Sequence, residues 1–199
     1  MNLKKNLANI LTLTNFSMGM IAILMASLVP SGTTYALTSK HILTYILAST
    51  LILIAGFTDR FDGKVARHFE TVSDPGKQLD SLSDLVSFGV APALLTWKIH
   101  ATMSTTVAPL ALQILTYAIT LFFPLAGALR LAKFNVQEDP SYFVGIPITL
   151  AGMFTCFLNI LFLRFSEPLQ PGWLIQVSIL LLIGIAAVLM ISRFKVKKR

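Results

Sequence analysis

Long apolar stretches separated by short polar breaks recur six times along the chain. They cover residues 7–29, 41–57, 79–97, 107–131, 144–164 and 173–192. A helix of about 17 to 25 apolar residues can cross the hydrocarbon core of a bilayer, and each stretch falls within or close to that length. Turn-forming residues such as Pro30, Gly32 and Pro140 occupy the breaks. The pattern predicts an all-α integral membrane protein with six transmembrane helices, and residues 1–199 form a single domain because little chain remains for another.

The composition agrees with a membrane protein and argues against a soluble, disordered, collagen-like or disulfide-rich secreted protein. Hydrophobic residues make up 55% of the chain and charged residues only 13%, against about 25% charged residues in soluble domains. Cys156 is the one cysteine, so an intrachain disulfide framework is impossible. The net charge is +7, and the cations flank apolar segments. The expected partners are therefore membrane lipids with anionic headgroups, and no nucleic acid.

The distribution of positive charge predicts the orientation in the membrane. Six spans place both termini on one side, and thirteen of the sixteen Lys and Arg residues then share that side. Because positively charged loops stay inside, we expect both termini in the cytoplasm of a protein that spans the cell membrane several times. The first apolar run is longer than the hydrophobic region of a signal peptide, so it is expected to remain as the first helix.

Acidic residues gather around the break between the second and third apolar stretches. They are Asp59, Asp62, Glu70, Asp74, Asp80 and Asp84. On a helix, Asp59 and Asp62 share one face, and so do Asp80 and Asp84. The polar segment 68–75 lets the two helices return antiparallel. Four aspartates are therefore expected to converge at the cytoplasmic edge of the bilayer.

Converging carboxylates near hydrocarbon repel one another and are poorly solvated. Cations such as Arg60 and Lys77 could neutralise them in an ion-pair network, or the carboxylates could hold metal. Oxygen ligands without Cys or His favour Mg²⁺ or Mn²⁺ over Zn²⁺. Two such ions would suit a displacement at phosphorus.

Residues 59–84 contain the pattern D-x2-D-G-x2-A-R-x8-G-x3-D-x3-D. This pattern resembles the signature of the CDP-alcohol phosphatidyltransferases at every fixed position. The resemblance implies that Asp59, Asp62, Asp80 and Asp84 hold two divalent ions on the pyrophosphate of a CDP-linked lipid, with Asp84 as the general base. It also implies a homodimer.

The rest of the motif suggests where the nucleotide of the CDP-lipid would lie. Gly63, Ala66 and Gly76 are small enough to let a flat ring approach the backbone, although each could equally serve helix packing or a turn. Arg67 could bind a phosphate oxygen, or it could only extend its charged end to the membrane interface. Asn9 and Thr12 begin a polar stripe on the first helix, which could meet the nucleotide or form interhelical hydrogen bonds.

The segments 79–92, 130–136 and 143–147 resemble the phosphatidylserine synthase branch of that family. The implied reaction transfers a phosphatidyl group from CDP-diacylglycerol to the hydroxyl of L-serine, which gives phosphatidylserine and CMP. A carboxylate of serine would favour Arg or Lys, and Arg130 and Lys133 are placed suitably, although both could simply be positive-inside residues. Ser87 and Asn135 are further candidates for the acceptor site.

Other functions remain open at this point. Within the family, the acceptor could be glycerol-3-phosphate or inositol phosphate. Outside it, intramembrane acids also occur in divalent metal transporters, whose sites usually lie near the bilayer midplane. A membrane scaffold without chemistry would leave the spacing of the acids unexplained.

Overall fold

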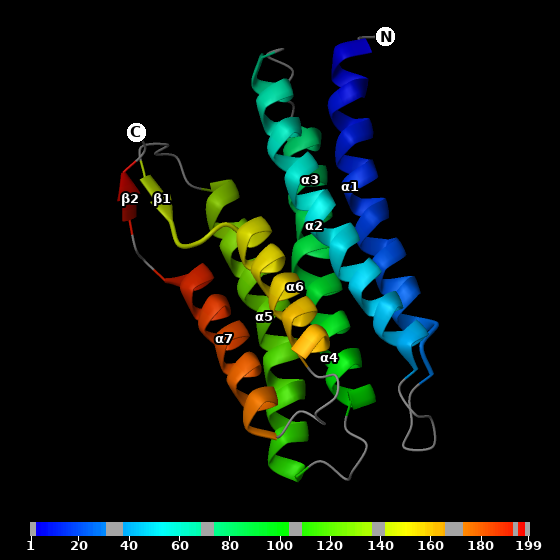
Figure 1. Cartoon of the computed structure of the whole chain (residues 1–199). Helices are drawn as coiled ribbons and strands as arrows, with labels where there is room; N and C mark the ends of the chain where they lie inside the picture. The colour runs from blue at the N-terminus through cyan, green and yellow to red at the C-terminus, as the bar shows by residue number, and fades with distance from the viewer. Residues whose placement is uncertain are drawn as a thin grey trace.

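The computed structural model describes residues 3–30, 38–68, 74–103, 109–136, 142–165, 173–192 and 195–197. Seven α-helices, one π-helix and two short strands follow one another along this part of the chain. They are α1 (Leu3–Ser27), α2 (Ser39–His68), α3 (Asp74–Asp84), the π-helix η1 (Leu85–Val90), α4 (Ala91–Met103), α5 (Leu110–Val136), β1 (Tyr142–Val144), α6 (Ile148–Phe165), α7 (Trp173–Ile191) and β2 (Lys195–Lys197). The helices form an elongated bundle (Figure 1).

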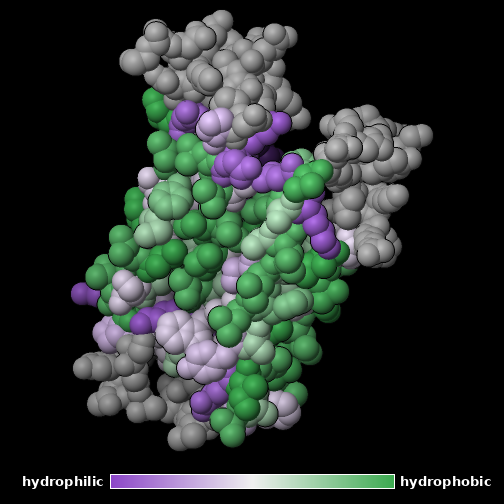
Figure 2. Space-filling model, turned by 180° about the vertical axis from the view of Figure 1, so that it is seen from behind, coloured by the Kyte–Doolittle hydropathy of each residue, from purple (hydrophilic) through white to green (hydrophobic). Residues whose placement is uncertain are grey.

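Six helical segments are long and apolar enough to cross a membrane, as the sequence predicts. The third of them is composite, because α3, η1 and α4 run on without a break. Hydrophobic side chains cover most of the middle of the face seen in Figure 2. Many large apolar residues of the spans are exposed, among them Leu121, Leu125 and Ile185, which is expected where lipid replaces water as the solvent.

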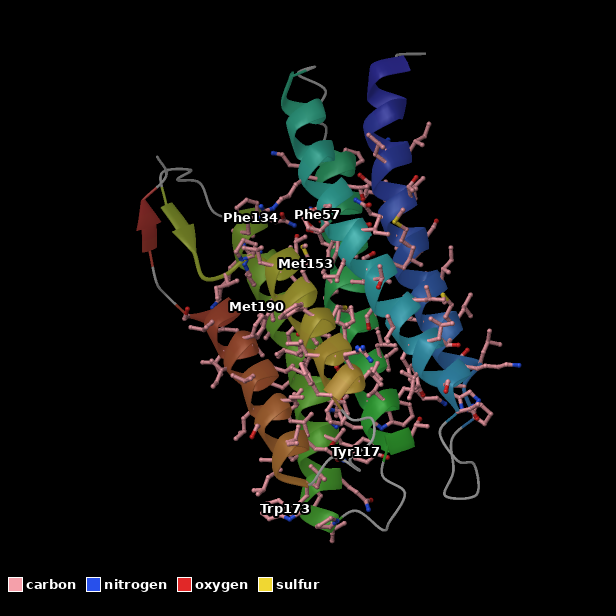
Figure 3. All side chains as sticks on the ribbon, viewed as in Figure 1. Phe57, Tyr117, Phe134, Met153, Trp173 and Met190 are labelled. Atoms are coloured by element: carbon pink, nitrogen blue, oxygen red, sulfur yellow. The ribbon has the colours of Figure 1, made fainter. Side chains whose placement is uncertain are left out.

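A tyrosine and a tryptophan lie toward one end of the bundle (Figure 3). Tyr117 and Trp173 lie toward the end opposite to Phe57 and Phe134 (Figure 3), and the ring centroids of Trp97 and Tyr117 are 6.4 Å apart. Trp and Tyr concentrate where a membrane meets water. The helix α1 begins at the other end of the bundle, where β2 also lies (Figure 1).

Two features correct the expected helix boundaries. Residues 144–147 were expected to begin the fifth span, but Val144 belongs to β1 and α6 begins only at Ile148, because Gly145 has φ = 70° and Pro147 follows it. The strand β1 pairs antiparallel with β2, with Phe143 opposite Val196. The all-α fold that the sequence predicts is thus confirmed, with one short strand pair beside the helices.

The π-helix lies in the centre of the bundle, with Ser87, Phe88 and Gly89 buried. Pro92 has no N–H to donate to the carbonyl of Phe88, and the N–H of Ala91 donates to the carbonyl of Val86 in a wider turn. The helix α6 approaches the backbone of this π-helix closely, since a Cβ on Gly152 would lie 2.5 Å from the Phe88 oxygen. This contact fixes the third span immediately after Asp84.

Polar side chains join the helices in the half of the bundle away from Asp84. The hydroxyls of Tyr45 and Thr102 are 2.8 Å apart, and Asn159 donates a hydrogen bond of 3.0 Å to Thr96. Such bonds hold membrane helices together.

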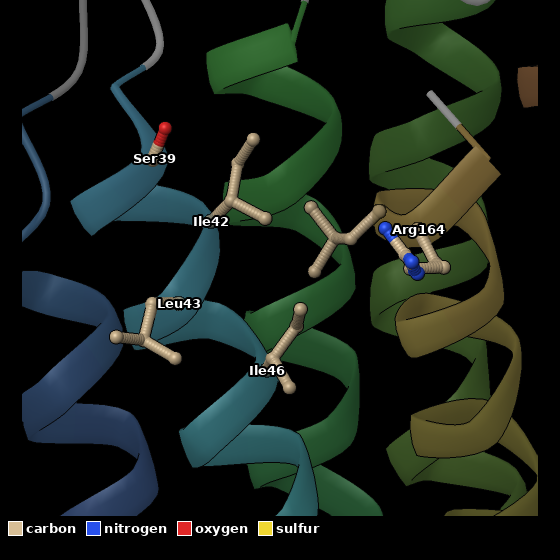
Figure 4. Close-up of a pocket in the computed structure, with 6 residues that line it drawn as sticks. Ser39, Ile42, Leu43, Ile46 and Arg164 are labelled. Carbon is tan, nitrogen blue, oxygen red and sulfur yellow. The ribbon is translucent and has the colours of Figure 1, made fainter. Parts of the chain in front are cut away.

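An open groove of about 210 Å³ lies at that end of the bundle, between α2 and α6 (Figure 4). It is lined by Ser39, Ile42, Leu43, Ile46, Leu163 and Arg164. Among the described residues that line this groove, none carries a carboxylate.

Candidate metal and substrate site

Three of the four motif aspartates come together where α2 meets α3. One carboxylate oxygen from each of Asp59, Asp80 and Asp84 lies within 4.8 Å of the others. Asp59 is on α2, in the last turns of the second span, and Asp80 and Asp84 are one turn apart on α3. The spacing of the acids thus predicted their meeting correctly for these three residues.

The remaining motif residues are only partly described. Asp62, Gly63, Ala66 and Arg67 belong to the last turns of α2, but their side chains lie outside the described residues. Gly76 is half-buried in the first turn of α3. The ligand role of Asp62 and the nucleotide roles of the other four therefore stay predictions.

Two side chains from distant helices face the carboxylates. Thr149, near the start of α6, donates a hydrogen bond of 3.2 Å from its Oγ1 to Oδ2 of Asp59. Arg130, near the end of α5, is close enough to Asp84 for direct electrostatic attraction. Its Nε is buried and makes no hydrogen bond within the described part of the chain, so the guanidinium keeps donor capacity for a ligand.

The donor set fits a hard divalent cation. All three ligand candidates are carboxylates, and each can offer an oxygen to Mg²⁺ or Mn²⁺. Three negative groups this close repel one another, and Arg130 is the one cation that offsets the charge of Asp84 within the described residues. A bound cation would remove the repulsion, so the geometry is compatible with metal binding.

The polar stripe of α1 packs against the third span. The hydroxyl of Ser83 donates to the carbonyl of Thr12 at 2.9 Å, and the hydroxyl of Ser87 donates to the carbonyl of Asn15 at 2.9 Å. Asn15 also accepts a hydrogen bond of 2.7 Å from Thr58, the residue before Asp59. These bonds position α1 against both halves of the carboxylate group, but two of them use backbone carbonyls of α1 and only one uses a side chain of the stripe, that of Asn15. The roles of Asn9 and Thr12 therefore stay predictions. Asn9 is half-buried and lies nearer the start of α1.

The four candidates for the acceptor site differ in their surroundings. Arg130 is half-buried beside Asp84, and Lys133 is exposed one turn beyond it. Asn135 is exposed, but its Nδ2 donates to the Ser81 hydroxyl at 2.9 Å. Ser87 is fully buried, and its hydroxyl donates to Asn15.

Three residues at the site were not predicted from the sequence. Thr149, Ser81 and Ser83 each bond to a residue of another helix at the site. Ser81 and Ser83 lie inside the motif at positions that it does not fix, and nothing in the sequence around Thr149 indicates its contact with Asp59. Only the packing of α6 against α2 reveals that bond.

A model of the family described as CDP-alcohol phosphatidyltransferase matches residues 5–192. The chain belongs to this family. The match extends over all six spans and includes both halves of the carboxylate group, so the earlier recognition from the motif is confirmed.

Several curated relatives are named CDP-diacylglycerol–serine O-phosphatidyltransferase. The protein of Bacillus subtilis is 36% identical over 147 residues, which cover 72% of this chain and 69% of the relative. The protein of Methanocaldococcus jannaschii is 35% identical over 166 residues, 81% of this chain and 71% of the relative. The protein of Helicobacter pylori strain J99 is 29% identical over 186 residues, 89% of this chain and 69% of the relative.

Proposed function

We propose that this protein transfers a phosphatidyl group from CDP-diacylglycerol to the hydroxyl of L-serine, giving phosphatidylserine and CMP. The observation that carries the proposal is the grouping of Asp59, Asp80 and Asp84 within 4.8 Å. The family supplies the class of reaction, and the names of the relatives support serine as the acceptor.

Asp59, Asp62, Asp80 and Asp84 would hold two Mg²⁺ or Mn²⁺ ions. When bound, these ions supply positive charge that stabilises the pyrophosphate of the CDP-lipid and the departing CMP. Their holders come from the ends of two spans, which would place the reacting phosphorus at the level of the lipid headgroups. Gly63, Ala66, Arg67 and Gly76 would contact the nucleotide, with Asn9 and Thr12 beside them on α1.

The chemical step needs a group that removes the proton of the serine hydroxyl. Asp84 is suited to this because its carboxylate lies within 4.8 Å of those of Asp59 and Asp80, where the ions and the reacting phosphorus would meet. As the hydroxyl oxygen attacks the phosphorus that carries diacylglycerol, Asp84 accepts its proton, and the bond from that phosphorus to the CMP oxygen breaks. A carboxylate in this position could contribute on the order of 10²-fold to 10⁴-fold to the rate.

Arg130 is proposed to hold the carboxylate of serine. Arginine binds carboxylates through two parallel hydrogen bonds, and the buried Nε of Arg130 makes none within the described residues. Lys133 would add positive charge from the next turn, and Asn135 would reach the acceptor if it left Ser81. Ser87 would contact the acceptor only if its bond to Asn15 opened.

The surroundings of the reaction follow from the same reasoning. The excess of Lys and Arg at the end that carries the aspartates favours the cytoplasm for both termini and for the active site. We expect the protein in the cell membrane, as a homodimer, as the family resemblance implies.

The decisive experiment supplies purified protein and Mg²⁺ with CDP-diacylglycerol and one acceptor at a time. Serine, glycerol-3-phosphate and inositol phosphate are compared, and the lipid product is identified by mass spectrometry. Phosphatidylserine in the serine reaction, with CMP in equal amount, is the expected result, and a chelator should abolish it. If product forms only with glycerol-3-phosphate or only with inositol phosphate, that compound and not serine is the acceptor. The class of reaction would be unchanged.

A further inference from the structure

We propose that Thr149 is a positioning residue for the metal site, which it controls by holding the carboxylate of Asp59. This inference rests on the proposed binding of divalent metal by Asp59. It assigns a function to a residue of α6, an element that contributes none of the four motif aspartates.

The first observation is the hydrogen bond itself. The Oγ1 of Thr149 lies 3.2 Å from Oδ2 of Asp59, and Thr149 is only 9% exposed. A carboxylate has about four acceptor positions on its two oxygens. Asp59 can therefore accept this bond and still offer oxygen to a cation, while the bond restricts rotation of the carboxylate.

The second observation is that the segment leading to Thr149 is fixed on several sides. Gly145 takes φ = 70°, and a Cβ there would lie 2.5 Å from the carbonyl oxygen of Met190. The N–H of Ile146 donates to the carbonyl of Leu189 at 3.3 Å. The start of α6 is thereby held against the end of α7.

The residue next to Thr149 is also confined. Ile148 is buried, and its Cδ1 lies against Gly127 of α5, where a Cβ would collide with it. With α7 on one side and α5 on the other, Thr149 has little freedom to leave Asp59. The hydroxyl can therefore orient the ligand before any metal binds.

Loss of the Thr149 hydroxyl is expected to lower the affinity of the site for metal. Removal of a group that hydrogen-bonds to a metal ligand typically lowers metal affinity or activity by about 10-fold to 100-fold. Thr149→Val removes the hydroxyl and keeps the branched shape, whereas Thr149→Ser keeps the hydroxyl.

A matched control lies one and a half turns farther along the same helix. Thr155 is fully buried, and its hydroxyl donates to the carbonyl of Ala151 at 3.0 Å within α6. Thr155→Val therefore makes the same chemical change in a similar environment without touching a carboxylate.

The test measures Mn²⁺ binding to the detergent-solubilised full chain by electron paramagnetic resonance of the free ion. Thr149→Val is expected to weaken binding by about 10-fold to 100-fold, with Thr149→Ser and Thr155→Val close to the wild type. In transfer assays, Thr149→Val should raise the Mg²⁺ concentration needed for half-maximal rate. The factor of this rise should be larger than the factor by which the rate at saturating Mg²⁺ falls.

The possible results separate this inference from the proposed function. Unchanged Mn²⁺ affinity in Thr149→Val overturns the inference alone. Equal losses in Thr149→Ser and Thr149→Val overturn it too, because they indicate that packing matters and the hydroxyl does not. A wild-type chain that binds no Mn²⁺ overturns the metal site of the proposed function, and the inference falls with it.

Discussion

Asn135 at the end of α5 is hydrogen-bonded to Ser81 of α3, with Nδ2 at 2.9 Å and Oδ1 at 3.3 Å from the serine Oγ. Ser81 follows Asp80 directly, so this bond joins the end of α5 to the carboxylate group. It gives Asn135 a structural role that competes with the acceptor contact predicted from the sequence.

Substitutions at the two ends of this bond distinguish the roles. If Asn135 acts only by holding Ser81, then Asn135→Ala and Ser81→Ala should have equal, small effects on the KM for serine, and the double variant should add little. Steady-state kinetics of the three variants provide the measurement. A rise in the KM for serine in Asn135→Ala alone would show that Asn135 contacts the acceptor.

Replacement of Asp84 should separate proton removal from metal binding. We expect Asp84→Asn to lower kcat by about 10²-fold to 10⁴-fold, because an amide cannot accept the proton. Excess Mg²⁺ should not restore this loss, whereas the activity of Asp80→Asn should recover partly as Mg²⁺ is raised. Release of CMP measures both variants, and gel filtration checks that they remain folded. Near wild-type turnover by Asp84→Asn would disprove its role as the base.

Arg130→Gln should weaken recognition of serine. Hydrogen bonds to charged groups contribute about 1.5 to 3 kcal/mol, so kcat/KM for serine should fall by roughly 10-fold to 100-fold. The KM for CDP-diacylglycerol should change less. Arg164→Gln is a matched control, because Arg164 is exposed on the groove at the opposite end of the bundle. Equal losses for both substrates would argue against a specific contact with serine.

Gly152→Ala should destabilise the bundle beside the site. The added Cβ would lie 2.5 Å from the Phe88 carbonyl oxygen and 2.9 Å from its Cα, and backbone cannot move aside easily. Overpacking of this kind costs about 1 to 3 kcal/mol, measurable by thermal unfolding in detergent. Gly184→Ala is the control, because its Cβ would meet only the flexible end of Ile119 at 2.8 Å. Equal stability of the two variants would contradict the close contact of α6 with η1.

The six spans could be predicted from the amino-acid sequence, and so could the meeting of three of the four ligand candidates. Hydrophobic length is a local property, and it located every span to within several residues. The spacing of Asp80 and Asp84 fixed their common face, and the antiparallel return of α3 brought them to Asp59. Both inferences needed only short-range geometry and the thickness of a bilayer.

The side chains that surround these carboxylates could not be predicted, because they come from distant parts of the chain. The bond of Thr149 to Asp59 joins positions 90 residues apart, and that of Asn135 to Ser81 joins positions 54 apart. The pairing of β1 with β2 likewise depends on segments that meet only after folding. Such contacts are set by how the helices pack, because small residues such as Gly152 determine how closely two backbones approach.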